Sequence, residues 1–199
     1  VALENQRSIE ALDELVKRAS YAPGGLAGNV GLNGPDVVGL FAMGKIAMLH
    51  GAIHQYGQVL TLNPKMEGNI GAFLNPGNRE KHTFVIGQTL VMTKKAQNKQ
   101  LAWEYLKLSL SKKWETERCL RMGYAPFRMD ITEPKVLENP IISVGMKGVE
   151  QGIMQPDFPE WLEFRDVLKN DIQSVFLGQK SSKEALSSSS VQLKKILSK

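Results

Sequence analysis

Apolar side chains recur at every third or fourth position in several stretches of the chain, with polar and charged side chains between them. The clearest example is residues 3–19, whose apolar stripe is formed by Ile9, Leu12, Leu15 and Val16. This spacing predicts an amphipathic helix. Other segments predict further helices, over residues 52–60, about 112–121, 141–151, 160–176 and 182–197.

Another predicted helix follows Asn98, whose side chain is expected to cap it. Five of its residues are expected to form the buried face: Leu101, Ala102, Tyr105, Leu106 and Leu108. Gly123 and Gly178 are expected to end the helices that precede them. Asp36 is expected to cap a short apolar stretch, and the serine run 187–190 is expected to be helix surface or a frayed segment.

Three shorter apolar runs, over residues 46–50, 70–74 and 84–92, predict strands. Gly51 ends the first run. Gly87 interrupts the third, which is typical of a bulge or of a close backbone approach. Strands that alternate with helices favour partly parallel pairing. The chain is therefore expected to be α/β or α+β and rich in helix, with three or four short strands.

Composition narrows the class of protein. The 199 residues carry a formal net charge of +5, and 42% of them are hydrophobic, which is ordinary for a globular protein of one domain or two small ones. No apolar run approaches the roughly 18 residues that a membrane helix needs. Neighbouring lysines occur as pairs and not as a continuous stripe, so a solvated basic surface is expected, and not a nucleic-acid-binding face.

The start of the chain carries neither an initiator methionine nor the apolar segment of a signal peptide. The first residues already belong to a predicted helix. We therefore expect the sequence to be part of a longer protein.

Two histidines, His50 and His54, have the spacing of a helical zinc motif. However, Gly51 stands where that motif carries its general base, and it is expected at the end of a strand. The two imidazoles would then not share a helical face, so no metal site is expected.

The single cysteine, Cys119, lies beside Arg118 and Arg121, whose charges would lower the pKa of its thiol. No histidine is near it in sequence, so it is interpreted as a half-buried structural cysteine.

The carboxylate pairs Asp13–Glu14 and Glu115–Glu117 lack a third orienting group, so we expect them to be solvated charges on helix surfaces. What remains is a set of glycine-flanked turns that carry aromatic or polar side chains. Clefts for small ligands are built from such turns when the fold brings them together.

Several segments resemble, in order along the chain, motifs of the extracellular solute-binding proteins. The resemblance is to the carbohydrate-binding type that serves ABC importers, with the maltose-binding protein as a relative. The segments that carry it are Phe41–Met48 with Gly51 shortly after, the strand from Gly87 and the helix from Asn98, the turn Gly123–Arg128, and residues 156–186.

The resemblance implies an α/β fold, namely the helix-rich C-terminal part of a two-lobed, periplasmic-binding-protein-like (type II) fold. Residues 1–199 would be the C-terminal half of such a protein, mainly its C-lobe, with a crossover segment of about 61–95 that belongs to the other lobe. An oligosaccharide or another polyhydroxylated solute would bind between the lobes, hinge closure would bury it, and a membrane permease would receive it.

Candidate ligand-binding residues follow from the matched positions: Gly51, Ile53, His54, Gly87, Gln88, Tyr124, Arg128, Trp161 and Arg165. Ile53 is a departure, because the family often has an aromatic residue there. Either His54 or Tyr56 would compensate, or the ligand would be an unusual one. Trp161 would replace a stacking tryptophan that the maltose-binding relative carries at the position of Arg165. Packing at a helix start is the alternative role for Trp161.

The resemblance further implies a binding protein and not an enzyme, with no cofactor, no metal and no nucleic acid. It implies a monomer that is extracellular, either as a membrane-anchored lipoprotein or in the periplasm. Three alternatives stay open: a hydrolase that uses His54 with a carboxylate, an interaction module without a small ligand, and a DNA-binding protein whose affinity falls steeply with salt.

Overall fold

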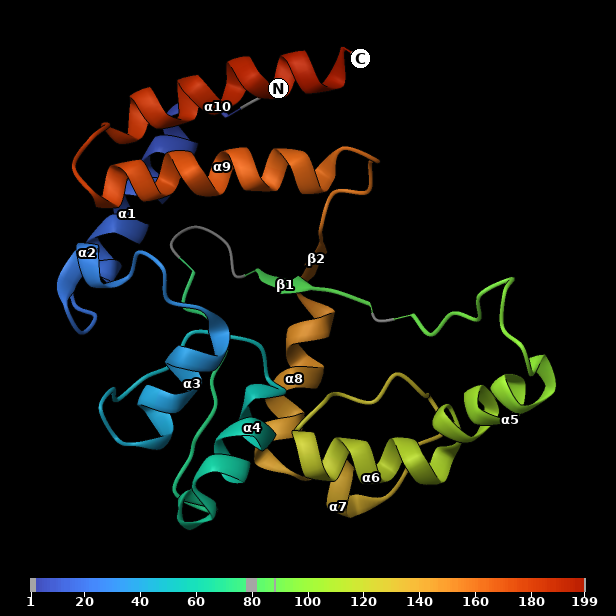
Figure 1. Ribbon diagram of the computed structural model, residues 1–199. Helices are drawn as coiled ribbons and strands as arrows, with labels where there is room; N and C mark the ends of the chain where they lie inside the picture. The colour runs from blue at the N-terminus through green and yellow to red at the C-terminus, as the bar shows by residue number, and fades with distance from the viewer. Residues whose placement is uncertain (1–2, 78–81, 88, 199) are drawn as a thin grey trace. The chain divides into compact units, whose positions relative to one another are not determined.

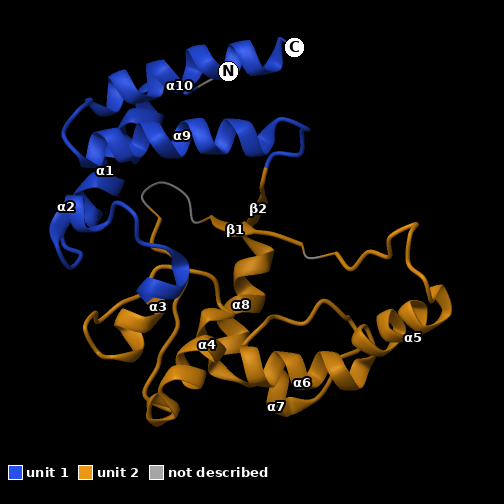
Figure 2. Cartoon of the chain, in the orientation of Figure 1, with its two compact units in different colours: residues 1–37, 156–199 blue, residues 38–155 orange. Residues whose placement is uncertain are grey.

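A computed structural model of the chain describes residues 3–77, 82–87 and 89–198. The chain divides into two compact units, shown in different colours in Figure 2. Unit 1 consists of residues 1–37 and 156–199, and unit 2 of residues 38–155.

Unit 1 is helical. It holds α1 (Gln6–Ala19), α2 (Gly25–Gly28), α9 (Trp161–Phe176) and α10 (Ser182–Leu197). Figure 1 shows α9 and α10 as an antiparallel pair, joined by a turn at Gly178. The apolar core of this unit lies between α1, α9 and α10 and contains Leu12, Val175, Ala185 and Leu186. The amphipathic pattern of residues 3–19 and 160–176 thus predicted these helices correctly.

A buried polar network also joins α9 to α10. Asp171 of α9 is only 5% exposed. It accepts hydrogen bonds from Lys180 Nζ at 2.5 Å and from Ser189 Oγ at 2.6 Å. Ser189 and Ser190 are fully buried, so the expectation that residues 187–190 are helix surface is wrong. Small side chains are needed there because α9 packs closely against this side of α10.

The start of α10 is fixed by two hydrogen-bonding arrangements. Ser181 and Glu184 form a reciprocal capping box, which satisfies backbone donors at the helix start. Ser182 Oγ donates to Asp13 Oδ1 at 2.5 Å and so connects α10 to α1. Asp13 is therefore an interhelical partner and not only a solvated charge.

Unit 2 holds most of the short elements. The boundary between the units falls within α3 (Gly34–Ala42), and the elements that follow are α4 (Gln55–Leu62), the 3-10 helix η1 (Pro64–Met66), β1 (Thr83–Val85), α5 (Lys99–Ser109), α6 (Lys112–Met122), α7 (Pro134–Leu137), α8 (Pro140–Glu150) and β2 (Gly152–Met154). One buried cluster joins Val38, Ala42 and Val59 of α3 and α4. A second surrounds Cys119 and includes Val136 and Ile142.

The strands differ most from the expectation. In the described residues, the sheet consists of β1 and β2, which pair in parallel with Phe84 opposite Ile153. Parallel pairing is thus confirmed, but residues 46–50 and 70–74 are not strands, and the run from 84 ends as a strand at Val85. An apolar run becomes a strand only if another strand offers its backbone groups. No such neighbour lies beside these runs in the described part of the chain.

Helix caps follow the sequence closely, with one correction. Asn98 Oδ1 accepts the Leu101 N–H at 2.9 Å, and Gly123 ends α6 with a φ of +73°. At α3, however, Asn33 is the cap: its Oδ1 accepts the Asp36 N–H, and Asp36 Oδ2 accepts the Asn33 N–H in return. Asp36 is therefore the reciprocal partner of the cap and not the cap itself.

The predicted buried face of α5 is wrong. Leu101, Tyr105 and Leu108 are each more than half exposed, and α5 contains no buried residue. Apolar periodicity indicates which face of a helix seeks a partner, but it does not place that partner. Within the described residues, no helix combines the length and the apolar character that crossing a membrane requires.

Candidate functional site

The start of α4 and the end of α6 lie unusually close together in unit 2. Gly57 of α4 is buried, and a Cβ on it would stand 2.6 Å from the Arg121 carbonyl oxygen and 2.7 Å from Met122 Cα. Only glycine permits this approach. The approach places the residue before α4, His54, beside the residue after the α6 cap, Tyr124.

The rings of His54 and Tyr124 are stacked. Their centroids are 5.3 Å apart, and their planes differ by 18°. The Arg118 guanidinium carbon lies 4.4 Å from the Tyr124 ring centroid and 5.2 Å from that of Phe127. These distances are within the range of cation–π attraction. We call His54, Glu115, Arg118, Tyr124 and Phe127 the Tyr124 cluster.

The carboxylate of the Tyr124 cluster is fully buried. Glu115 accepts hydrogen bonds from Arg118 Nε at 2.9 Å and Arg118 Nη2 at 3.0 Å, and a third from the Phe127 N–H at 2.9 Å. Burial alone would lower the pKa of Arg118, but the hydrogen bonds and charge of Glu115 outweigh it and raise that pKa. The expectation that Glu115 is a solvated surface charge is therefore wrong.

Cys119 lies under the same carboxylate. It is fully buried, and its Sγ lies 3.7 Å from Glu115 Oε1. Burial and the charge of Glu115 raise the pKa of the thiol to about 12. The expectation that the thiol has a lowered pKa is therefore wrong, because the charge of Arg118 lowers it by less than these two effects raise it. Cys119 is also fully buried, whereas the sequence predicted a half-buried cysteine. The cysteine is part of the buried core of unit 2.

The Tyr124 cluster offers a set of groups suited to binding a neutral polar ligand. His54 and Tyr124 are partly buried, and Phe127 is 53% exposed. Aromatic rings offer apolar faces, and the imidazole and the phenol add hydrogen-bonding groups at the edges. In the part of the chain that the structure describes, no group of three or more His, Cys, Asp or Glu side chains is arranged to hold a metal ion.

The other expected site residues of unit 2 have different surroundings. Ile53 lies against α8, where a Cβ on Gly145 would stand 3.5 Å from Ile53 Cγ1. Gly51 is exposed, and a Cβ on it would collide with the Gln55 side chain, whose Oε1 is buried without a hydrogen-bond partner. Arg128 donates two hydrogen bonds of 2.7 Å to Asp130 and one of 2.9 Å to the Leu110 carbonyl. The structure thus brings His54 and Tyr124 into direct contact, while Ile53 and Arg128 have other partners.

Gly87 follows β1 and is exposed, with open space where a side chain would lie. Gln88 lies outside the described residues.

The two expected residues of unit 1 lie one helical turn apart on α9. Trp161 packs edge-on against Phe158 with ring centroids 5.8 Å apart, and its centroid is also 5.8 Å from that of Phe164. Arg165 is exposed and pairs with Asp166 at 3.2 Å. Trp161 therefore has the packing contacts of a helix start.

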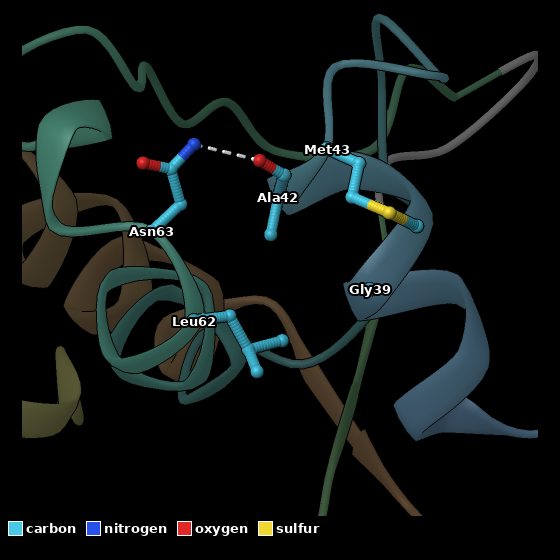
Figure 3. Close-up of a pocket in the computed structure, with 5 residues that line it drawn as sticks. All are labelled: Gly39, Ala42, Met43, Leu62 and Asn63. Atoms are coloured by element: carbon cyan, nitrogen blue, oxygen red, sulfur yellow. Dashed lines mark hydrogen bonds between the residues drawn. The ribbon is translucent and has the colours of Figure 1, made fainter.

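A pocket of about 360 Å³ lies between α3 and α4 of unit 2 and is shown in Figure 3. It is lined by Gly39, Ala42, Met43, Leu62 and Asn63. The one polar side chain, Asn63, donates from Nδ2 to the Ala42 carbonyl oxygen at 2.8 Å. A lining that is apolar apart from one amide is poorly suited to a ligand with many hydroxyl groups.

Sequence reasoning missed three members of the Tyr124 cluster: Glu115, Arg118 and Phe127. The spacing of Glu115 and Arg118 on one helix permits an ion pair, and this local signal was available. The burial of that ion pair could not be predicted from this spacing, because it depends on the chain folding back over Glu115 at Phe127.

The profile of the family described as bacterial extracellular solute-binding protein matches residues 4–143. The chain belongs to this family. The matched range contains the whole Tyr124 cluster, and the resemblance drawn from the sequence is confirmed.

Two relatives in sequence are a binding protein of Brucella abortus (strain 2308) and the diacetylchitobiose binding protein DasA of Streptomyces coelicolor. The first is 23% identical over 82% of this chain and 40% of its own length. The second is 26% identical over 61% of this chain and 29% of its own length. The chain thus spans less than half of these relatives.

Solved structures share the fold. An ABC transporter solute binding protein from Thermotoga lettingae, bound with α-D-tagatose, has a TM-score of 0.87 at 20% identity over 98% of this chain and 50% of its own. The maltose-bound T. maritima MalE3 has a TM-score of 0.85 at 18% identity, over 98% of this chain and 52% of its own. The expected helix-rich, periplasmic-binding-protein-like (type II) fold is confirmed, and the chain spans about half of these structures.

Proposed function

We propose that the chain is part of the substrate-binding component of an ABC importer that captures a carbohydrate. In this proposal, the sugar binds between two lobes, hinge closure buries it, and a membrane permease receives it. Family membership supports a binding role. The names of relatives support the ligand class, because they include a diacetylchitobiose binding protein and structures bound with tagatose and maltose.

The observation that carries the proposal is the stack of His54 and Tyr124 at 5.3 Å. The two side chains lie 70 positions apart in the sequence, and the fold brings them face to face where α4 begins and α6 ends. Beside this stack, the Phe127 ring is 53% exposed and offers an aromatic face that suits the C–H side of a pyranose, and the phenol and imidazole edges can satisfy its hydroxyl groups. A hydroxyl left without a partner in such a site costs about 1–3 kcal/mol, which is a source of selectivity.

The remaining matched residues complete the proposal. Gly87 and Gln88 would let backbone approach the ligand, and Arg128 would support the turn that carries Tyr124. Trp161 and Arg165 would contribute from α9. The protein would act as a monomer on the outer side of the membrane, as a lipoprotein or in the periplasm.

The hydrolase alternative finds less support than binding. A histidine base is usually oriented by a carboxylate, and the structure gives His54 no hydrogen bond to a carboxylate within the described residues. The ring is instead engaged with Tyr124. Binding without covalent chemistry is therefore the function we propose.

The test is titration of the full-length protein that contains this chain with a sugar panel including maltose, maltotetraose, tagatose and diacetylchitobiose. Isothermal titration calorimetry reports binding, and tryptophan fluorescence of the wild type and of Trp161→Phe reports the part played by Trp161. We expect saturable binding of at least one sugar, which is recovered chemically unchanged. Absence of binding across the panel contradicts the proposal, and release of hydrolysed sugar supports the hydrolase.

A further inference from the structure

We propose that Arg118, held by Glu115, is the positioning residue that fixes Tyr124 and Phe127 in the orientation that a sugar requires. This inference rests on the proposed function of the Tyr124 cluster. Arg118 acts without touching the ligand, because its effect passes through the rings of Tyr124 and Phe127.

The first step is the fixed orientation of the guanidinium. Glu115 is fully buried, and a buried carboxylate is stable only when its oxygens are paired. Arg118 meets it with two N–H groups, at 2.9 Å and 3.0 Å. A two-pronged contact restricts the plane of the guanidinium as well as its position, which a lysine ammonium would not do.

The second step is the contact with two rings of one turn. The guanidinium carbon lies 4.4 Å from the Tyr124 centroid and 5.2 Å from the Phe127 centroid. The backbone of the same turn is held by the same carboxylate, since the Phe127 N–H donates to Glu115 Oε1 at 2.9 Å. One buried ion pair therefore anchors both the path of the turn and the rings that it carries.

The third step extends the anchor to α4. Tyr124 stacks on His54, which directly precedes α4. Rotation of the Tyr124 ring would remove this stack. The orientation of the proposed sugar-binding face thus depends on a residue that lies on α6 and belongs to none of the matched ligand positions.

The same geometry would also arise if the ion pair only stabilised the fold. The two roles separate in a double variant, Glu115→Gln with Arg118→Met. Removing one partner alone leaves a buried charge, whereas removing both leaves none. The double variant should therefore recover stability relative to Arg118→Met, but it still lacks the guanidinium that orients the rings.

The experiment uses the full-length protein and the sugar of the panel that binds best. Arg118→Met and the double variant are compared with the wild type by calorimetry and thermal unfolding. The matched control is Arg121→Met, on the same helix, whose side chain is 81% exposed and pairs with Glu117. We expect both variants of Arg118 to bind at least about tenfold more weakly, the double variant to unfold at a higher temperature than Arg118→Met, and the control to bind as the wild type does.

A spectroscopic readout makes the inference independent of the ligand. The His54 ring protons lie beside the Tyr124 ring, so their NMR shifts report the stack. Loss of this ring-current shift in the double variant supports the inference even if no sugar binds the wild type, in which case only the proposed function fails. Sugar affinity and His54 shifts that both remain at wild-type values in the double variant overturn the inference.

Discussion

Gly57 of α4 lies so close to Arg121 of α6 that a Cβ on the glycine would stand 2.6 Å from the arginine's carbonyl oxygen. Gly57→Ala is therefore expected to force α4 away from α6 and to lower the free energy of unfolding by about 1–3 kcal/mol. Urea denaturation of the full-length protein measures this change. The same substitution should also weaken the contact between His54 and Tyr124.

The matched control is Gly39→Ala in α3. Gly39 is also a helical glycine, but a Cβ there would meet nothing within 4 Å. Alanine is favoured over glycine in a helix interior by about 0.5–1 kcal/mol, so Gly39→Ala should not destabilise the protein. Equal losses in the two variants would contradict the account of the α4–α6 contact.

Asp171→Asn is expected to destabilise the α9–α10 pair by about 1–3 kcal/mol at pH 7. Burial alone would raise the pKa of Asp171, but the hydrogen bonds from Lys180 and Ser189 outweigh it and lower that pKa. A carboxyl group whose pKa falls on folding stabilises fully above its ordinary pKa, and this stabilisation is lost as the pH falls through the folded value. The difference between wild type and variant should therefore be complete at pH 7 and shrink below about pH 4.

The control for Asp171 is Asp166→Asn on the same helix, whose side chain is 63% exposed. It should change the unfolding free energy by less than about 0.5 kcal/mol. A difference between wild type and Asp171→Asn that grows towards low pH would contradict the lowered pKa of Asp171.

Cys119 is expected to resist alkylation in the folded protein. Its thiol is fully buried, and its pKa is raised to about 12, so little thiolate is present and reagents do not reach it. Iodoacetamide at pH 8, followed by mass analysis of the peptide that contains Cys119, should show modification only after denaturation in urea. Rapid modification under native conditions would contradict the placement of Cys119 in the core.

Local signals in the sequence predicted much of the helical structure. Asn98 caps α5, Gly123 ends α6 and Gly178 ends α9, because capping depends on one or two residues near the helix end. The amphipathic stripe of residues 3–19 also predicted both α1 and its buried face, since Leu12 is buried as its spacing requires.

Features set by distant residues could not be predicted in this way. Ser189 is buried on the side of α10 that faces α9, where Asp171 accepts a hydrogen bond from its hydroxyl group. Glu115 is buried because the chain folds back over it at Phe127, whose N–H donates to the carboxylate. Met48, in an apolar run expected to form a strand, is 74% exposed. Of the candidate site, the sequence pointed to His54 and Tyr124 separately, but their stacking depends on the close approach at Gly57.

The central claim is that the His54–Tyr124 pair takes part in binding a sugar. The direct measurement is calorimetric titration of the full-length wild type and of Tyr124→Ala with the best sugar of the panel. Tyr105→Ala is the control, because Tyr105 is a tyrosine of unit 2 that is 65% exposed on α5. We predict that Tyr124→Ala weakens binding by at least about tenfold and that Tyr105→Ala leaves it unchanged. Binding by Tyr124→Ala that equals the wild type would contradict the account.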